Sequence, residues 1–229
     1  MGIQERYRRE RAQVDEACLA AGRSSEEVLL LAVSKTVDVS GAQEAFAAGA
    51  RAFGENRPDE LLRKASALPQ AQWHFIGNIQ SRRIPDIVAH ADLIHSLYQV
   101  KHARKMDEAA AQLGKVQEVL LEVNVSGEAS KSGVAPQDAL GLMEDVAALP
   151  HLSLRGLMTM APQGDRTYAR QCFQELVALA DQLRTQLPPS DAQAFDQISA
   201  GMSEDWEEAI AAGSTIVRLG RAIFSEEFE

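Results

Sequence analysis

Lys35 has the clearest potential for chemistry, because it follows directly on the apolar run LLLAVS that ends at Ser34. A lysine at the end of a buried strand would carry its amine into the mouth of the fold. Desolvation and a nearby arginine would both favour the neutral amine, which can attack an aldehyde. The alternative is a lysine whose stem covers the rim of the fold while its ammonium stays in water.

Two segments near the C-terminus have the composition of a phosphate site, since each ends an apolar run with glycines and polar residues. They contain Ser199, Gly201, Met202 and Ser203 in the first and Arg218, Gly220 and Arg221 in the second. Glycines let the backbone approach a ligand, and N–H groups at a helix start bind phosphate oxygens. The alternative is a helix capped by Ser203, with ordinary turn glycines. A lysine amine together with a phosphate site fits pyridoxal 5′-phosphate (PLP), which carries an aldehyde and a phosphate on one rigid ring.

Four further residues have side chains that could take part in chemistry. Asn56 ends the run FGE, and it either hydrogen-bonds a ring substituent of a cofactor or caps the helix that begins after it. His74 opens an apolar run, which predicts a core or bottom-face position. Tyr98 is the only tyrosine expected to reach the mouth of the fold. Lys131 lies in the small, polar segment GEASKSG, which predicts a mobile loop on the functional face with an exposed lysine.

Several classes of protein are excluded by motif and composition. HExxH and Cys-x-x-Cys spacings are absent, as are the Walker-type phosphate loop, GxSxG and GxGxxG after a strand. The net charge of −10 argues against a nucleic-acid surface. No apolar run is long enough to cross a bilayer, and the polar N-terminus lacks the pattern of a signal peptide. We therefore expect a cytoplasmic protein, with Cys18 and Cys172 as packed thiols.

The elements that must position these residues alternate along the chain. Short apolar runs predict strands at 28–34, 50–55, 73–77, 93–98, 119–125, 154–160, 195–201 and 215–220. Helical patterns lie between them, and runs that are apolar on both faces pair in parallel. Eight strands and seven intervening helices in 229 residues predict an α/β fold, a (β/α)8 barrel forming a single domain over 1–229. A doubly wound open sheet is the alternative.

Two features of the chain favour a closed barrel over an open sheet. The sequence ends soon after the eighth strand, which leaves no room for an eighth helix. A surplus amphipathic helix at about 2–21 can cover that position instead. Because site residues gather at the carboxyl ends of barrel strands, Lys35, Asn56, Ser199 and Arg218 are expected around one opening.

At these residues the sequence resembles the PLP homeostasis proteins, also called the YggS/PROSC family. The resemblance covers nearly the whole chain and rests on LLAVSKT, FGEN, WHFIGNIQ, VNVSGEASKSGV, LRGLMTMAP and SAGMSEDWEEAIAAGSTIVRLGRAIF. Members are similar to the barrel domain of fold-type III PLP enzymes such as alanine racemase. They lack its second domain, and no robust catalytic activity is assigned to the family.

The resemblance also implies a role for each site residue. Lys35 would form the Schiff base, and Arg218 would face the pyridine nitrogen. The phosphate would be held by the groups that follow: the backbone N–H groups of Gly220 and Arg221, Ser199, and the Met202–Ser203 backbone. The sequence departs from the family pattern at three places: Arg221 replaces Thr or Ser, Arg57-Pro58 follows FGEN, and QSRR replaces Gln-x-Asn-Lys.

An arginine opposite the ring nitrogen keeps that nitrogen unprotonated, which weakens the ring as an electron sink. A racemase tolerates this with a second acid/base group from an extra domain, which this chain lacks. We therefore expect a monomeric PLP-binding protein of intracellular PLP homeostasis that stores or delivers PLP without turnover. PLP-dependent apoenzymes are its expected partners, with no nucleic acid or membrane. The alternatives are a racemase-like enzyme using Lys35 with Tyr98, and a barrel isomerase for a phosphorylated sugar.

Overall fold

Eight parallel strands close into a barrel in the computed structural model, which describes residues 1–128, 130–162 and 164–228. The strands are β1 (Leu29–Val33), β2 (Ala52–Glu55), β3 (Gln72–Phe75), β4 (Leu93–Leu97), β5 (Gln117–Glu122), β6 (Leu152–Met158), β7 (Gln197–Met202) and β8 (Ile216–Leu219). They follow one another in sequence order, and β8 pairs in parallel with β1. The expected (β/α)8 barrel is confirmed, and the open-sheet alternative is wrong.

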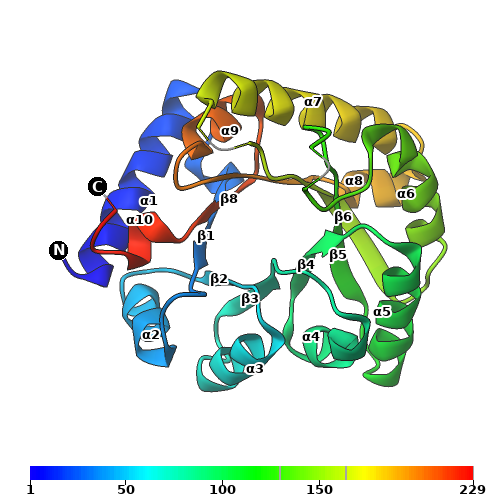
Figure 1. The fold of residues 1–229 in the computed structure, drawn as a ribbon, viewed down its shortest axis with the longest axis horizontal. Helices are drawn as coiled ribbons and strands as arrows, with labels where there is room; N and C mark the ends of the chain where they lie inside the picture. Colours follow the sequence, from blue (N-terminus) through cyan, green and yellow to red (C-terminus); the bar gives the residue numbers. More distant parts are fainter. Residues whose placement is uncertain (129, 163, 229) are drawn as a thin grey trace.

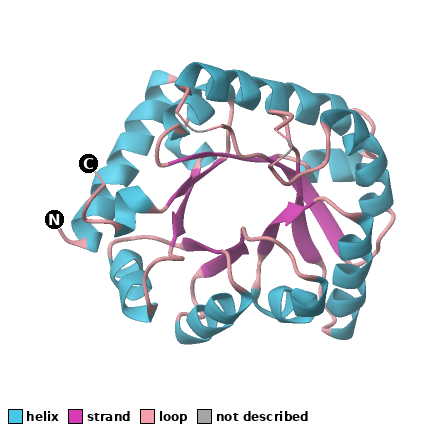
Figure 2. Cartoon of the chain, in the orientation of Figure 1, coloured by secondary structure: helices cyan, strands magenta, loops and turns pink. Residues whose placement is uncertain are grey.

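A ring of helices surrounds the strands (Figures 1 and 2). The helices are α1 (Ile3–Ala20), α2 (Val39–Ala47), α3 (Pro58–Ala67), α4 (Ile84–His90), α5 (Val100–Gln112), α6 (Ala139–Ala147), α7 (Arg166–Arg184), α8 (Pro189–Ala194), α9 (Trp206–Ala212) and α10 (Arg221–Phe224). Short 3₁₀ turns lie at Ser25–Glu27, Ser81–Arg83 and Pro136–Asp138. None of the helices in the described part of the chain has the length and hydropathy needed to cross a bilayer.

The core consists of two sets of apolar side chains. A small cluster takes one residue from each of six strands, which places it inside the barrel; its members are Leu31, Ala52, Leu93, Leu120, Met158 and Ile216. A larger cluster fills the space between strands and helices, and includes Phe53, Trp73 and Phe173. Both cysteines, Cys18 and Cys172, are free and buried there, as expected.

The strand ends differ from the sequence-based expectation by a few residues. The fifth and sixth strands begin two residues earlier than their apolar runs, at Gln117 and Leu152. These two residues are register partners, and the Gln117 N–H donates to the His151 carbonyl at 2.9 Å. Backbone hydrogen bonds therefore extend both strands beyond their apolar runs, and the hydropathy pattern does not mark these added residues.

The two ends of the chain close the helical ring together (Figure 1). Helix α1 contacts α2, α9 and α10, and it buries Val14 and Cys18 in the core. The buried Arg6 donates from Nε to the Ile223 carbonyl at 2.7 Å. The prediction that α1 occupies the place of an eighth helix is confirmed. A single turn of helix, α10, follows β8 over four residues, which the sequence pattern did not predict.

Candidate functional site

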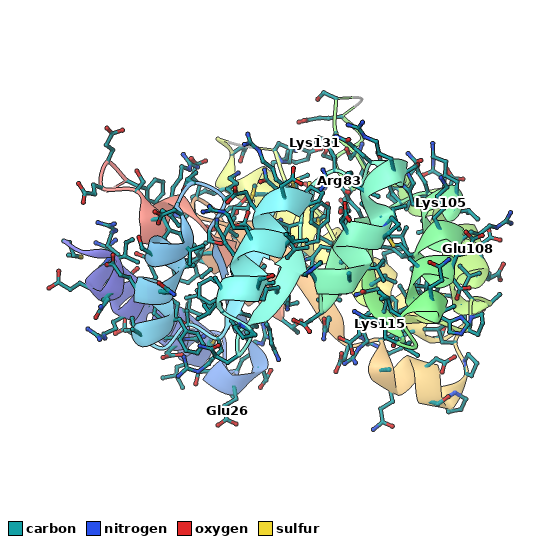
Figure 3. All side chains as sticks on the ribbon, turned by 90° about the horizontal axis from the view of Figure 1, so that it is seen from below. Glu26, Arg83, Lys105, Glu108, Lys115 and Lys131 are labelled. Atoms are coloured by element: carbon teal, nitrogen blue, oxygen red, sulfur yellow. The ribbon has the colours of Figure 1, made fainter. Side chains whose placement is uncertain are left out.

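Four adjacent strands carry the predicted site residues. Because β1 pairs with both β2 and β8, and β8 with β7, the segments after these strands lie side by side at one opening of the barrel. Figure 3 shows the two ends of the barrel: Lys131 marks this opening and Glu26 the opposite end. The predicted gathering of Lys35, Asn56 and the two C-terminal segments is thus confirmed at the level of the strands.

Lys35 lies two residues beyond the end of β1, and its side chain is exposed to solvent. Among the described residues, no hydrogen bond or ion pair involves its Nζ atom. The expectation of a desolvated amine is therefore wrong for the protein without a ligand. The reason is that Lys35 lies beyond the end of the buried strand, so its long side chain extends into water.

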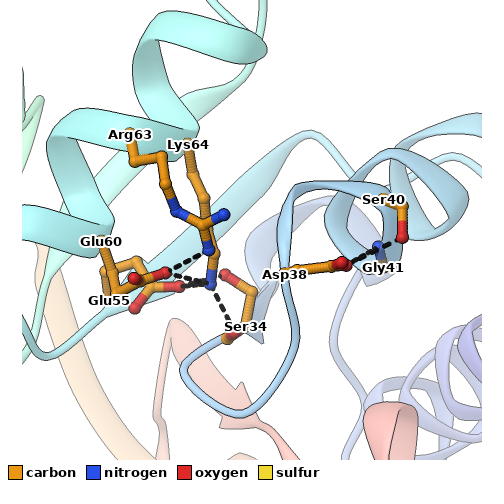
Figure 4. A network of polar contacts seen from close by, with 8 residues as sticks. All are labelled: Ser34, Asp38, Ser40, Gly41, Glu55, Glu60, Arg63 and Lys64. Atoms are coloured by element: carbon orange, nitrogen blue, oxygen red, sulfur yellow. Dashed lines mark hydrogen bonds and ion pairs between the residues drawn. The ribbon is translucent and has the colours of Figure 1, made fainter.

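The residue before Lys35 is held by a buried polar network (Figure 4). Lys64 of α3 donates from Nζ to the Ser34 carbonyl at 2.7 Å and to Glu55 Oε1 at 2.6 Å. The Ser34 hydroxyl also donates to Glu55 Oε1, at 2.6 Å. Sequence reasoning missed Lys64, because a lysine within an amphipathic helical pattern predicts a solvent-facing side chain.

The first of the two predicted phosphate segments, residues 199–203, forms a bulge at the end of β7. The register of β7 against β8 shifts between Ser199 and Met202, and Gly201 adopts φ +92°. A Cβ at Gly201 would lie 2.6 Å from the Ala209 Cβ, so the loop packs directly on α9. The Met202 N–H donates to Asp205 Oδ1 at 2.6 Å, which means that this amide already has an acceptor.

Ser203 connects the two segments, since its hydroxyl accepts the Ala222 N–H at 3.4 Å. It does not cap α9: the residue before that helix is Asp205, so the alternative of a Ser203 cap is wrong. Asn56 does not cap α3 either. It is exposed, the residue in the cap position is Arg57, and no side chain makes the capping hydrogen bond.

The second predicted phosphate segment, residues 218–221, has backbone N–H groups beside β1 that make no hydrogen bond within the part of the chain that the structure describes. The N–H groups of Gly220 and Arg221, at the start of α10, have no acceptor among the described residues. A Cβ at Gly220 would lie 3.3 Å from the Val33 carbonyl oxygen, so this turn lies against the strand that leads to Lys35. The start of a helix with two unpaired donors fits the oxygens of a phosphate.

The Arg221 side chain turns away from these amides. Its Nη2 lies 2.5 Å from Glu204 Oε1, and its guanidinium carbon is 5.0 Å from the centre of the Phe228 ring. The ion pair joins the loop after β7 to the turn after β8. Arg221 in place of the Thr or Ser of the family pattern therefore keeps the backbone N–H donor and adds an ion pair between these two loops.

Arg218 lies inside the barrel and is 5% exposed. Its Nη1 donates to the Ser199 hydroxyl at 2.7 Å and its Nη2 to the Thr159 carbonyl at 3.0 Å. Burial lowers the pKa of Arg218 to about 10, while Asp205 and Glu122 act in the opposite direction. The guanidinium therefore stays charged at neutral pH, and it is held in one orientation.

A chain of hydrogen bonds continues from Arg218 through the barrel interior. Ser199 Oγ lies 2.9 Å from His95 Nδ1, and His95 Nε2 lies 2.9 Å from His74 Nδ1. Because an arginine can only donate, Ser199 accepts from Arg218, and the tautomers of His95 and His74 set the direction of the two bonds that follow. Burial lowers the pKa of His74 to about 4 and that of His95 well below its usual value, so both rings are neutral at pH 7.

This chain confirms the core position predicted for His74, and it adds His95, which sequence reasoning missed. It also shows that the Ser199 hydroxyl faces Arg218 and His95 within the barrel. The proposed contact of Ser199 with phosphate stays a prediction. Near the same arginine, burial raises the pKa of Glu122 to about 7, although Arg218 opposes this effect.

The loop after β5 is tied to the mouth by several contacts. Lys131 donates from Nζ to the Met160 carbonyl at 3.2 Å, and its side chain is 19% exposed. It is therefore not the fully exposed loop lysine that was expected, because it reaches across to the loop after β6. Tyr168 donates from its hydroxyl to the Ser126 carbonyl at 3.3 Å, so Tyr98 is not the only tyrosine near the mouth.

A cavity of about 480 Å³ lies at the opposite, amino-terminal end of the strands. Its lining includes Glu27, His74, Asp92, Glu118 and Gln197, and carboxylates predominate. A site of that charge disfavours a phosphate. In the part of the chain that the structure describes, no cluster of three His, Cys, Asp or Glu side chains could hold a metal ion.

Comparison with known proteins identifies the family of this chain. Residues 17–227 match the family model described as alanine racemase, N-terminal domain. The pyridoxal phosphate homeostasis protein of Pasteurella multocida is 39% identical over 98% of this chain and 97% of its own. The protein of the same name from Pseudomonas aeruginosa is 44% identical, over 93% of this chain and 90% of its own.

Solved structures agree with these relatives. PipY of Synechococcus elongatus PCC7942, with PLP bound, is 32% identical and superimposes with a TM-score of 0.84, covering 97% of this chain and 100% of that one. A diaminopimelate decarboxylase from M. jannaschii has a TM-score of 0.77 at 13% identity, covering 97% of this chain and 60% of that one. The likeness to the decarboxylase shows a shared fold only.

Proposed function

The chain belongs to the pyridoxal phosphate homeostasis proteins and carries the alanine racemase N-terminal domain, and on this premise we propose that it binds PLP at the barrel mouth. Its role would be the reversible storage or delivery of PLP in PLP homeostasis, with the cofactor held as a Schiff base on Lys35. The residues proposed to hold the cofactor are Lys35, Asn56, Ser199, Gly201, Met202, Ser203, Arg218, Gly220 and Arg221.

One observation supports this proposal most strongly. The exposed amine of Lys35 and the unpaired N–H groups of Gly220 and Arg221 lie just beyond the ends of two strands that pair with each other. Ala32 of β1 is the register partner of Leu219 of β8, and the turn at Gly220 lies against Val33. Lys35 and the start of α10 thus flank a single space, in which one ligand with an aldehyde and a phosphate can reach both. A phosphorylated sugar would use the amides but has less need of the amine.

The covalent step requires little from the protein. The neutral amine of Lys35 attacks the aldehyde carbon, a C=N bond replaces the C=O bond, and the aldehyde oxygen leaves as water with the two amine protons. An exposed amine in open solvent makes the reverse hydrolysis equally accessible. Reversible attachment is what a storage or delivery protein needs.

Arg218 disfavours catalytic turnover. PLP supplies an electron sink when its ring nitrogen is protonated, and a charged guanidinium facing that nitrogen opposes protonation. The hydrogen bonds of Arg218 to Ser199 and to the Thr159 carbonyl hold it in place. We therefore propose a carrier of PLP, acting as a monomer in the reducing cytoplasm, where its two free thiols persist.

A racemase-like activity is the second candidate, because the Tyr168 hydroxyl at the mouth offers a second acid/base group. Incubation of the PLP-loaded protein with single-enantiomer amino acids in heavy water separates the two. A carrier leaves the Cα hydrogen in place, whereas incorporation of solvent deuterium with turnover would support the enzyme.

The central test of the proposal is the absorbance spectrum of the protein before and after addition of PLP. A new band near the violet edge, followed by borohydride reduction and peptide mapping to Lys35, is the expected result. The Lys35→Ala variant should lose the reducible adduct, while Lys131→Ala should keep it. A reducible adduct that persists in Lys35→Ala would contradict the assignment of Lys35.

A further inference from the structure

Lys64 is the one lysine in the described part of the chain whose side chain is almost completely buried, at 1% exposure. Its ammonium lies under the loop after β1 and donates hydrogen bonds to two oxygens, the Ser34 carbonyl at 2.7 Å and Glu55 Oε1 at 2.6 Å. Glu60 Oε2, at 3.6 Å, adds an ion pair. Because the ammonium is buried and paired with these groups, Lys64 is not a second point of attachment for an aldehyde.

The effect of this network is to fix Ser34, the residue immediately before Lys35. The Ser34 N–H donates to the Gly54 carbonyl at 3.1 Å, its hydroxyl donates to Glu55, and its carbonyl accepts from Lys64. Each polar group of Ser34 is therefore held. The strand ends at Val33, and the Ser34 carbonyl also accepts the Val37 N–H at 3.1 Å, so Lys64 is the side chain that ties this turn to α3.

Stability alone is a poor explanation for the network. Removing two charges from water costs several kcal/mol per ion, and well-packed apolar side chains often stabilise a protein as much or more. In addition, Glu55 Oε2 is buried without a hydrogen-bond partner among the described residues. A partly satisfied polar network adds less stability than an apolar core would.

We infer that Lys64, acting through Ser34 and Glu55, is a positioning residue that holds the backbone at Lys35 for attachment of PLP. The inference rests on the proposed function. The Lys35 side chain is exposed and makes no hydrogen bond or ion pair among the described residues, so its backbone defines the region that the amine can reach. A fixed Cα lets the amine meet a ring whose phosphate is held independently at the start of α10.

Two variants test the inference. Lys64→Met alone leaves Glu55 charged and buried, and this variant is at risk of unfolding. Lys64→Met combined with Glu55→Gln removes both charges and keeps an amide that accepts the Ser34 hydroxyl, so the double variant is expected to fold. The matched control is Lys115→Met: Lys115 also donates to two backbone carbonyls, those of Val88 and Ala91, but it lies far from the mouth (Figure 3).

Two readouts distinguish positioning from a structural role. Pyridoxine 5′-phosphate has an alcohol in place of the aldehyde, so its affinity reports the phosphate and ring contacts alone. We expect this affinity to stay within about twofold of the parent in the double variant. The rate at which the violet absorbance grows after PLP addition should fall by about 10- to 100-fold, because small misplacements of reacting groups have effects of that size. Lys115→Met should keep the parental rate.

The outcomes separate the inference from the proposed function. A folded double variant that forms the adduct at the parental rate would overturn the inference and leave the proposed function intact. Equal losses in pyridoxine 5′-phosphate affinity and in adduct rate would also overturn it, since they indicate general damage to the mouth. A parent protein that forms no reducible adduct at Lys35 would overturn both.

Discussion

Lys35 and Arg218 differ most in how firmly the protein holds them. The lysine side chain extends into solvent from a fixed backbone, whereas the arginine is buried and hydrogen-bonded at both Nη atoms. The amine of Lys35, to which PLP would attach, can therefore change position, whereas the guanidinium of Arg218, proposed to face the ring, is held in place. This combination suits a protein that must release its cofactor intact.

Ser199→Ala should weaken cofactor binding by freeing Arg218. The substitution removes the acceptor for Arg218 Nη1 and the hydrogen-bond partner of His95 Nδ1, and a hydrogen bond to a charged group contributes about 1.5–3 kcal/mol. We expect the affinity for pyridoxine 5′-phosphate to fall by about tenfold or more. Titration followed by ring absorbance measures it, with the exposed Ser190→Ala as control. An unchanged affinity would show that Arg218 does not depend on Ser199.

His74 should make the protein less stable in acid. Burial lowers its pKa from 6.5 to about 4, so between these values the unfolded chain binds a proton that the folded protein does not. Stability is therefore present above about pH 6.5 and is lost as the pH falls towards 4. Between about pH 7 and about pH 5 this contribution amounts to roughly 2 kcal/mol.

His74→Gln isolates this contribution. Glu122, whose raised pKa of about 7 makes the folded protein bind the extra proton, acts in the opposite direction but is present in both proteins. Urea denaturation at the two pH values should show a smaller loss of unfolding free energy for the variant than for the parent. Equal losses would show that His74 is protonated in the folded state.

At the scale of the elements, the bulge at the end of β7 depends on a residue without a side chain. Gly201→Ala places a Cβ at φ +92° and 2.6 Å from the Ala209 Cβ, so the loop must move away from α9. We expect a loss of about 2 kcal/mol in unfolding free energy. Affinity for pyridoxine 5′-phosphate should fall with it, because the displaced loop contacts the turn after β8 through Ser203.

Gly141→Ala is the matched control for this prediction. Gly141 lies in α6, and an added Cβ there meets no atom within 4 Å. Alanine favours a helix interior over glycine by up to about 1 kcal/mol, so this variant should be slightly more stable with unchanged affinity. Parental affinity in Gly201→Ala would show that the bulge does not shape the phosphate site.

The strands were predictable because a buried parallel strand appears in the sequence as an apolar run. The side-chain contacts around a strand leave no such pattern in the sequence. The burial of Lys64 and the chain through His95 depend on partners far away in sequence, and both residues have ordinary surface or core patterns in their own segments. Lys35 shows the opposite case: its placement after β1 was correct, but its solvation depends on what covers the mouth. Local sequence carries no information on that cover.

At the scale of the whole molecule, the two thiols report whether the barrel opens as one unit. Cys18 lies on α1 and Cys172 on α7, and both are buried, with a pKa raised by burial. If the barrel unfolds cooperatively, thiol labelling in the single variants Cys18→Ala and Cys172→Ala should give the same opening free energy. Faster labelling of Cys18 would mean that α1 detaches before the barrel opens.

The closed topology was the most predictable feature at this scale, because eight strand signals in one short chain leave few alternatives. The single turn of helix after β8 was not predicted. A four-residue helix such as α10 has too few residues to show a periodic pattern, and its role follows only from the packing of α1 against it.

The pairing of the first strand with the last has a consequence for synthesis on the ribosome. β1 leaves the ribosome early, but its partner β8 and the turn at Gly220 emerge only after the other strands of the barrel. Until then the nascent chain has an unpaired edge at β1, and Lys35 has no phosphate site beside it. A nascent chain that lacks β8 thus also lacks the proposed phosphate site, and we expect it to bind PLP more weakly than the closed barrel.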